Sequence, residues 1–271
     1  MKKIVFIGAG SMAQAIIHGW MKEKTVSFEN VFVMNKSDRV KQMYLQETYG
    51  VQIIRDDKEF IRTADLIILA TKPKDVQEAM ESIASYLSST TVVLSVLAGV
   101  PMSTIEKGLG IRPIARCMPN TSATIGMSAS AVTWNKHVKD KTKEEIMELL
   151  KAVGSVIQVE EEDELHVITA LSGSGPAYVY YFVEAFEKAA VSSGLSSKVA
   201  RELLIETIAG SAQMLKQSSK SPELLRNQVT SPGGTTEAGL AALQKNGFIE
   251  ILGNCLKDAE LRSRELGKQY D

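Results

Sequence analysis

The sequence has few cysteines, few histidines and no long apolar run, and each shortage argues against a class of protein. Two of its 271 residues are cysteine and three are histidine. Cys117 and Cys255 lie far apart, and neither has another cysteine or a histidine at metal-ligand spacing, so neither a disulfide framework nor a metal site is supported. No segment approaches the roughly 18–20 consecutive apolar residues of a membrane helix. We therefore expect a protein without a metal, stabilised by its apolar core.

The chain also has no marked excess of positive or negative charge. The chain carries 31 Lys and Arg against 32 Asp and Glu, and its longest run of like charge is the acidic stretch 160–164. This balance argues against nucleic acid or an anionic membrane as a partner. In the first residues, MKKIVFIGAG, glycine ends the apolar run after four residues, which indicates a first strand and no signal peptide. We expect a cytoplasmic protein.

Residues 1–162 alternate between short apolar runs and amphipathic stretches. The apolar runs lie at 4–7, 31–34, 65–70 and 91–97. The amphipathic stretches lie at 13–21, 38–49, 75–87 and 102–109. Further apolar runs at 112–118, 128–134 and 155–160 extend the expected sheet, with a helix at 143–153. This alternation is typical of a parallel sheet with crossover helices, so we predict an α/β, Rossmann-like doubly wound domain at 1–162.

The pattern changes at Asp163, where strand-like runs end. Long helical stretches follow, separated by GSGP, SSGLSS and SPGGTT, and they predict an all-α domain at 163–271. The stretch 167–191 is apolar around much of its helical circumference, more than a surface helix needs. We interpret that excess as a dimer interface, although a central helix of a monomeric bundle would show the same pattern.

A glycine turn follows the first strand. Gly8, Gly10 and Ala13 form G-x-G-x-x-A between a strand and a helix, the context that gives this motif its meaning. Gly8 permits a tight turn, Gly10 lets a pyrophosphate approach the backbone, and Ala13 lets the helix pack closely on the strand. We predict that Gly8, Gly10, Ser11 and Met12 bind a dinucleotide. A glycine turn without a ligand is the alternative.

The end of the second strand indicates which dinucleotide binds. NAD-specific enzymes usually place an acidic residue there, about 20 residues beyond the glycines. Here the strand ends in Asn35, Lys36 and Ser37, whose amide, cation and hydroxyl suit a 2′-phosphate. We therefore predict NADPH, with NADH as the weaker alternative; Lys36 as an ordinary solvated lysine remains open. Asp38 is interpreted as a helix-start residue.

Two further strand ends should lie at the same edge, because ligands in such folds bind at the carboxyl ends of the strands. One strand runs into the sequence ATKP at 70–73, and the next ends in LAG at 97–99. Lys72 is placed to touch a ribose or a phosphate, and the small residues at 97–99 would let a flat ring lie on the backbone. The expected cofactor contacts are Ala70, Lys72, Pro73 and Ala98. A glycine turn before Pro101 would also explain the second segment.

Motifs along nearly the whole chain resemble those of pyrroline-5-carboxylate reductases. In order they are GAGSMA, ATKP, LAGV, RCMPN, SGSGPAYV and LRNQVTSPGGTTEAGLAAL. The SPGGTT motif is specific to that family, whereas many dehydrogenases share the glycine turn. The resemblance implies a Rossmann domain followed by a helical domain that interlocks with a partner's in a homodimer or larger homo-oligomer. It also implies NADPH-dependent reduction of the cyclic imine 1-pyrroline-5-carboxylate to L-proline, the last step of proline biosynthesis.

The resemblance also assigns site residues. The loop from Ser231 to Thr236 is expected to hold the substrate carboxylate, and Thr236 to approach the ring nitrogen; Asn120 would line the nicotinamide site. The expected substrate-binding residues are Ser231, Gly233, Gly234, Thr235 and Thr236. A hydroxyl is a poor general acid, so we expect Thr236, the one catalytic assignment, to act first by positioning. The same segment can also be a loop and helix start capped by Thr235 or Thr236, and the two interpretations are compatible.

Two positions differ from the family's usual motifs, and three other functions are alternatives to this one. Thr71 stands where valine is frequent, and Asp57 stands where some members contact the adenosine with asparagine. A β-hydroxyacid dehydrogenase would need Lys188 or Lys198 as its lysine, without a supporting motif. A reductase of a six-membered imino acid differs by one methylene of substrate, worth about 1–3 kcal/mol. A non-catalytic NADPH-binding regulator would retain the fold and lose the chemistry.

Overall fold

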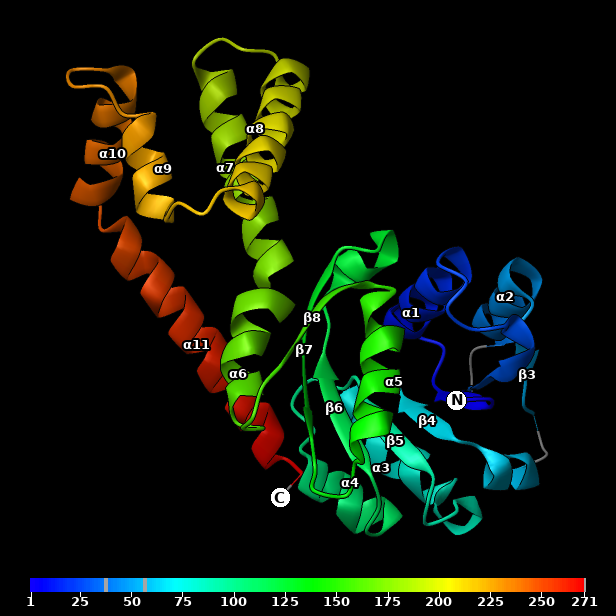
Figure 1. Cartoon of the computed structure of the whole chain (residues 1–271). Coiled ribbons are helices and arrows are strands. Elements are labelled where there is room, and N and C mark those ends of the chain that lie inside the picture. The colour runs from blue at the N-terminus through cyan, green and yellow to red at the C-terminus, as the bar shows by residue number, and fades with distance from the viewer. Residues whose placement is uncertain (37–38, 56–57, 271) are drawn as a thin grey trace. The chain divides into compact units, whose positions relative to one another are not determined.

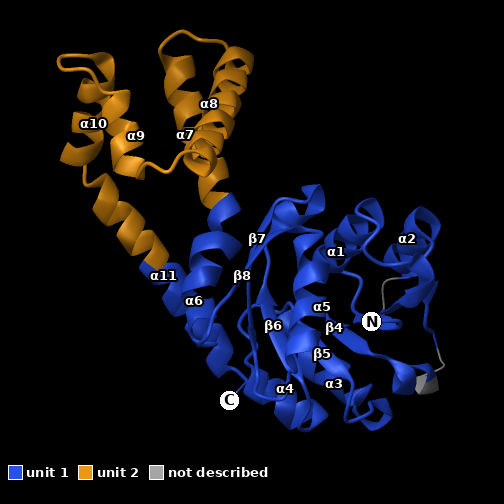
Figure 2. Ribbon diagram, viewed as in Figure 1, with its two compact units in different colours: residues 1–176, 257–271 blue, residues 177–256 orange. Residues whose placement is uncertain are grey.

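The computed structural model describes residues 1–36, 39–55 and 58–270. The chain forms two compact units (Figure 2): unit 1 comprises Met1–Pro176 with Lys257–Asp271, and unit 2 comprises Ala177–Leu256. The sequence-based boundary between 162 and 163 stays a prediction, because a division by proximity does not test which residues serve which function.

Unit 1 is built on a sheet that, in the described part of the chain, has eight strands (Figure 1). Across the sheet they are β3 (Gln52–Ile53), β2 (Val31–Met34), β1 (Ile4–Ile7), β4 (Leu66–Leu69), β5 (Val92–Ser95), β6 (Ile114–Met118), β7 (Ser128–Trp134) and β8 (Gly154–Gln158). The strand order reverses between β1 and β4, so the predicted doubly wound α/β fold is confirmed.

The pairing of β6 with β7 is antiparallel, whereas every other strand pair described is parallel. A parallel sheet extended by these strands was expected, and the antiparallel pairing of β7 corrects that expectation. Only a short 3-10 helix, η5 (Thr121–Ile125), lies in the connection between them. A parallel return would need a crossover of about a dozen residues or more, so the short connection imposes the reversal.

Helices cover both faces of the sheet because its central strands are buried on both sides. Ile4 and Phe6 of β1 face α1 (Ser11–Lys22), α2 (Arg39–Tyr49) and α5 (Asp140–Lys151). Val5 and Ile7 face α3 (Val76–Glu81) and α4 (Met102–Leu109). The remaining 3-10 turns of unit 1 are η1 (Phe28–Asn30), η2 (Lys58–Thr63), η3 (Pro73–Asp75) and η4 (Ala84–Tyr86).

The amphipathic stretch at 75–87 forms α3 and η4 separately, with no single continuous helix. The break lies at Ser82, whose hydroxyl donates to the carbonyl oxygen of Ala79 at 2.8 Å. A serine side chain that bonds its own backbone competes with helix propagation, which explains the stop.

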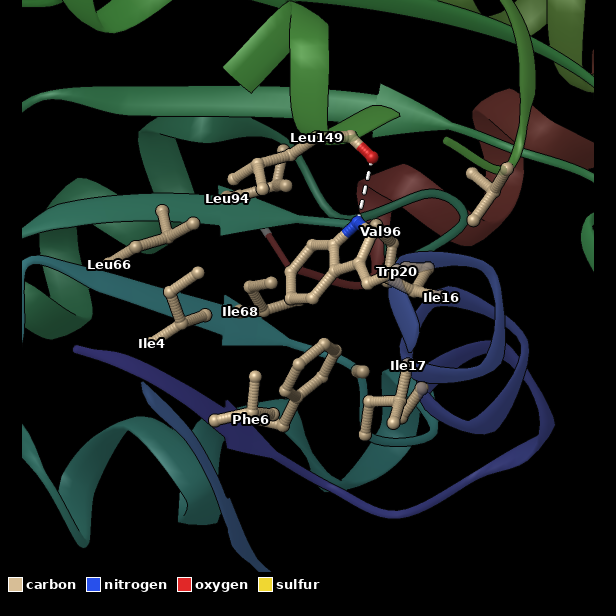
Figure 3. Packing of buried hydrophobic residues seen from close by; sticks show 14 of the residues in the cluster. Ile4, Phe6, Ile16, Ile17, Trp20, Leu66, Ile68, Leu94, Val96 and Leu149 are labelled. Carbon is tan, nitrogen blue, oxygen red and sulfur yellow. Dashed lines mark hydrogen bonds between the residues drawn. The ribbon is translucent and has the colours of Figure 1, made fainter. Parts of the chain in front are cut away.

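Trp20 joins α1 to the end of α5 at the centre of one core face (Figure 3). Its side chain is fully buried, and its indole N–H donates to the carbonyl oxygen of Leu149 at 2.7 Å. The ring also packs on Phe6, with the two ring centroids 5.4 Å apart. One side chain thereby fixes a helix early in the chain against another far from it in sequence.

Charged residues fix the segment that follows β8. Arg116, buried on β6, pairs with Glu162 at 2.7 Å, and the same carboxylate accepts the Met102 amide at 2.8 Å. Asp163 pairs with Arg264 from the last turns of α11 (Phe248–Lys268), and that hydrogen bond lowers the pKa of Asp163. These pairs hold the start of α6 (Glu164–Ile168) and the end of the chain on unit 1.

His166 lies in the same region. Its Nδ1 is 2.9 Å from the Ser263 hydroxyl, and burial, with the nearby Arg116 and Arg264, lowers its pKa. The π-helical turn η6 (Thr169–Gly173) then leads into α7 (Gly175–Ser192), which has Pro176 in its first turn. The expected break at SGSGP is thus a change of helix type with no loop between.

Unit 2 is all-helical, as predicted for the second half of the chain. Besides most of α7 and the start of α11, it contains α8 (Ser197–Gln217), α9 (Pro222–Gln228) and α10 (Thr235–Lys245). Of residues 177–256, all of which the structure describes, only Ala200 is buried. Large exposed apolar side chains include Tyr180, Tyr181, Leu203, Val229 and Ile249. No helix in the described ranges is both long and apolar enough to cross a membrane.

We predict that Trp20→Phe lowers the free energy of unfolding by about 1–3 kcal/mol, because the buried carbonyl of Leu149 loses its donor. Trp134→Phe is the matched control, since the Trp134 indole N–H has no partner among the described residues. Urea unfolding followed by circular dichroism measures both. Equal losses in the two variants would show that the Trp20 hydrogen bond contributes nothing beyond ring volume.

Candidate functional site

The carboxyl ends of four neighbouring strands form one continuous edge in unit 1. Past the end of β1, the Gly8 amide donates to the Met34 carbonyl oxygen of β2 at 2.8 Å. Past the end of β4, the Ala70 amide donates to the carbonyl oxygen of Ile7 at 2.9 Å. Past the end of β5, the Val96 amide donates to the carbonyl oxygen of Leu69 at 3.1 Å. The edge includes the switch point between β1 and β4, where ligands of such sheets bind.

Gly8 is required by close backbone packing at this edge. Its φ is +109°, and an added Cβ would lie 2.6 Å from the Ala70 carbonyl oxygen and 2.8 Å from the Thr71 nitrogen. Gly10 differs, since its φ of −71° suits any residue and an added Cβ would meet nothing closer than 3.6 Å. The fold therefore explains Gly8, while the bare backbone at Gly10 leaves room for a ligand.

The start of α1 is suited to an anion. Gly10 is the N-cap, and no side chain caps this helix end, so the first amides of α1 are not bonded by a cap. Ser11 is exposed in the first turn, whereas Met12 packs against the core. The helix dipole and these amides favour a phosphate, which fits the pyrophosphate of a dinucleotide.

The structure brings most of the predicted cofactor residues to this edge. They are Gly8, Gly10, Ser11, Asn35, Lys36, Ala70, Lys72, Pro73 and Ala98. Lys72 is exposed just before η3, with Pro73 as the first residue of that turn. Ser37, Asp38 and Asp57 lie outside the described residues, so those predictions stand as made.

Lys36 has a partner that the sequence did not reveal. Its ammonium pairs with the carboxylate of Glu78 in the first turn of α3, and both side chains are exposed. The residues are 42 positions apart, so only the fold brings them together. An exposed ion pair of this kind is worth at most about 1 kcal/mol, so a phosphate could displace the carboxylate.

Asn120 is held by the protein at both ends of its side chain. The amide oxygen accepts from Ser122 N at 3.1 Å, and the amide nitrogen donates to the Ser172 carbonyl oxygen at 3.0 Å. Its backbone amide donates to the Ser128 hydroxyl at 3.0 Å. The residue therefore fixes the backbone at the start of η5 against η6, and its cofactor contact stays a prediction.

The Ser231–Thr236 loop in unit 2 leads directly into α10. The expected loop and helix start are present, but the N-cap of α10 is Gly234 and no side chain caps the helix, so the expected cap at Thr235 or Thr236 is wrong. Because Gly234 is the N-cap, Thr235 and Thr236 are the first two residues of the helix. An added Cβ on Gly234 would lie 2.4 Å from the Ser231 hydroxyl, so a side chain there would force that hydroxyl to move.

Two amides of this loop are already engaged. The Gly233 amide donates to the Glu237 carboxylate at 2.7 Å, and the Gly234 amide donates to the Ser231 carbonyl oxygen at 3.0 Å. The amides of Thr235 and Thr236 are among the first of α10, which have no partner inside the helix. An anionic ligand of this loop is therefore best received by those two amides.

A hollow lies beside the loop, between α9 and α10. Its polar lining comes from Arg226, Asn227, Thr230, Glu237 and Gln244. Arg226 contributes a positive charge to this hollow, and Glu237 from the first turn of α10 contributes a negative one. Lys188, which a β-hydroxyacid dehydrogenase would need, instead pairs with Glu184 at 2.6 Å on α7, four residues away on the same helix.

Two family models match the chain. The model described as pyrroline-5-carboxylate reductase dimerisation matches residues 162–266. The model described as NADP oxidoreductase, coenzyme F420-dependent, matches residues 3–99. The first includes the loop that leads into α10, and the second includes the glycine turn and the carboxyl ends of β1, β2, β4 and β5.

Similar proteins match over nearly their whole length. Pyrroline-5-carboxylate reductase 2 of Bacillus subtilis (strain 168) is 44% identical over 271 residues, 100% of this chain and 97% of that protein. The solved pyrroline-5-carboxylate reductase of Coxiella burnetii is 36% identical with a TM-score of 0.91, over 98% of each chain. That of Plasmodium falciparum, solved with NADP bound, is 30% identical with a TM-score of 0.87, again over 98% of each chain.

We predict different outcomes for alanine at the two glycines of the turn. Gly8→Ala should lower the melting temperature and abolish NADPH binding, because the methyl group would collide with the Ala70–Thr71 peptide. Gly10→Ala should melt like the wild type yet bind NADPH at least about tenfold more weakly. The added methyl group would keep the pyrophosphate from the backbone and so weaken one charge-assisted hydrogen bond. Differential scanning fluorimetry and fluorescence titration measure both. Unchanged NADPH affinity in Gly10→Ala would remove the turn from the site.

Proposed function

The chain belongs to the pyrroline-5-carboxylate reductase family, and on that premise we propose how its own residues reduce 1-pyrroline-5-carboxylate to L-proline. The protein is an NADPH-dependent oxidoreductase of proline biosynthesis. The observation that carries this function is the combination, in one chain, of a glycine turn at the sheet's switch point and the Ser231–Thr236 loop at the start of α10.

The residues at the sheet edge fit NADPH. The Gly8–Gly10 backbone and the uncapped first turn of α1 would receive the pyrophosphate. Lys36 would neutralise the 2′-phosphate after leaving Glu78, and Asn35 and Ser37 would offer it hydrogen bonds. Lys72, Ala98 and Asn120 would line the ribose and nicotinamide portions. When bound, NADPH supplies the hydride for the ring C=N carbon.

The Ser231–Thr236 loop would bind the substrate. The amides of Thr235 and Thr236 receive the carboxylate, and the Ser231 hydroxyl, which lies against Gly234, adds a further donor. Thr236 directs its hydroxyl toward the ring nitrogen and so fixes which face of the ring accepts the hydride. A protonated imine needs no strong acid from the protein, which agrees with a site built from amides and hydroxyls.

The chain associates with itself through the C-terminal helices. Residues 162–266 match the dimerisation model, and unit 2 leaves its large apolar side chains exposed in a single chain. In our proposal residues 1–162 hold the cofactor, while residues 163–271 hold the substrate and the partner subunit. A cytoplasmic location, proposed from the few cysteines and balanced charge, would suit this reaction.

The function is tested by following NADPH absorbance when 1-pyrroline-5-carboxylate is added, with NADH in parallel. We predict that Thr236→Val lowers kcat about 10- to 100-fold, the effect of one hydrogen bond to a charged group, and changes NADPH affinity little. Thr236→Ser, which keeps the hydroxyl, should retain most of the wild-type kcat. If Thr236→Val turns over like the wild type, this residue does not act in the site.

We also predict that Lys36 and Glu78 set the preference between NADPH and NADH. Lys36→Glu should weaken NADPH binding at least about tenfold more than NADH binding, because a carboxylate would then face the 2′-phosphate. Glu78→Gln should tighten NADPH binding and leave NADH unchanged, since Lys36 loses its competing partner. Dissociation constants at low and high salt measure this. Equal effects on both cofactors would place the 2′-phosphate elsewhere.

A further inference from the structure

Thr71 carries a hydroxyl that the protein itself does not use. It stands two residues after the end of β4, at the carboxyl edge of the sheet. Its Oγ1 is buried and has no hydrogen-bond partner among the described residues, although the residue as a whole is only half-buried. The solvent-exposed surface of Thr71 therefore comes from atoms other than the hydroxyl oxygen.

A buried hydroxyl without a partner is unfavourable, and in folded proteins such groups are uncommon enough to need an explanation. Thr91 shows the usual arrangement in this sheet. It precedes β5 at the opposite edge, is almost fully buried, and donates its hydroxyl to the Ala64 carbonyl oxygen at 3.1 Å. The unpaired hydroxyl of Thr71 is thus not a general feature of threonines beside these strands.

The place of Thr71 suggests what could pair with it. Its backbone nitrogen would lie only 2.8 Å from a Cβ on Gly8, so Thr71 lies directly against the glycine turn. The uncapped amides at the start of α1 follow that turn. An anion received by these amides would therefore lie beside the backbone segment that carries Thr71.

We propose that Thr71 is a cofactor-binding residue whose hydroxyl donates a hydrogen bond to a pyrophosphate oxygen of the dinucleotide. Rotation about Cα–Cβ exchanges the hydroxyl with the methyl group, and both positions are staggered wells open to threonine. The rotation breaks no hydrogen bond, since the hydroxyl has none within the described protein. This inference rests on the proposed function only in taking NADPH as the ligand.

The test compares Thr71→Val, Thr71→Ser and the matched control Thr91→Val. Thr71→Val should melt at the wild-type temperature or above without ligand, because it removes an unpaired buried hydroxyl, yet bind NADPH about three- to tenfold more weakly. Thr71→Ser should keep the NADPH affinity. Thr91→Val should melt lower, because the Ala64 carbonyl loses its donor, and should bind NADPH normally.

Fragments of the cofactor identify the atom that is bound. The loss in Thr71→Val should recur with 2′-phospho-ADP-ribose, which contains the pyrophosphate, and be absent with adenosine 2′-monophosphate, which has no 5′-phosphate. Calorimetric titration gives each dissociation constant. Equal affinity of Thr71→Val and wild type for NADPH would overturn the proposal, as would an equal loss with adenosine 2′-monophosphate.

Binding of NADPH and its oxidation by substrate are measured separately. A wild-type protein that binds NADPH but does not oxidise it with 1-pyrroline-5-carboxylate would overturn the proposed function. The dissociation constants of the Thr71 variants would still decide the role of the hydroxyl, because they are measured without substrate.

Discussion

The helices of residues 177–256 have almost no buried core within one chain, and this lack of burial constrains the loop and helix start that they carry. Only Ala200 is buried there. Ordering the backbone costs about 1–2 kcal/mol per residue, which apolar burial must offset, so a second chain has to supply the missing contacts. The Ser231–Thr236 loop and the first turn of α10 belong to the same unit. The geometry that would hold the substrate therefore depends on association between subunits.

The two binding regions are supported in different ways. At the sheet edge, main-chain hydrogen bonds between adjacent strand ends continue past β1 and β4, and close packing at Gly8 fixes the turn. In the loop before α10, the support is local, from Glu237 to the Gly233 amide and from Ser231 to the Gly234 amide. The cofactor edge is thus organised by tertiary structure, whereas the loop depends on its own hydrogen bonds and on the helices around it.

Much of this fold follows from local sequence. The apolar runs at β1, β2, β4 and β5 predict buried strands because both faces are covered, and the glycine spacing predicts the turn after β1. The direction of β7 was not foreseen, since apolar periodicity carries no strand direction. The pairing of Lys36 with Glu78 and the unpaired hydroxyl of Thr71 depend on contacts between distant elements. Residue spacing alone holds no signal for either.

The last turns of α11 return to unit 1, where Ser263 contacts His166, Arg264 pairs with Asp163, and the Tyr270 carbonyl accepts from Thr104. A nascent chain leaves the ribosome from its first residue onward. The Rossmann half must therefore wait, with this seam open, until residues 177–256 have emerged. The dimerising helices have thus left the ribosome before the contacts of Ser263, Arg264 and Tyr270 with unit 1 can form.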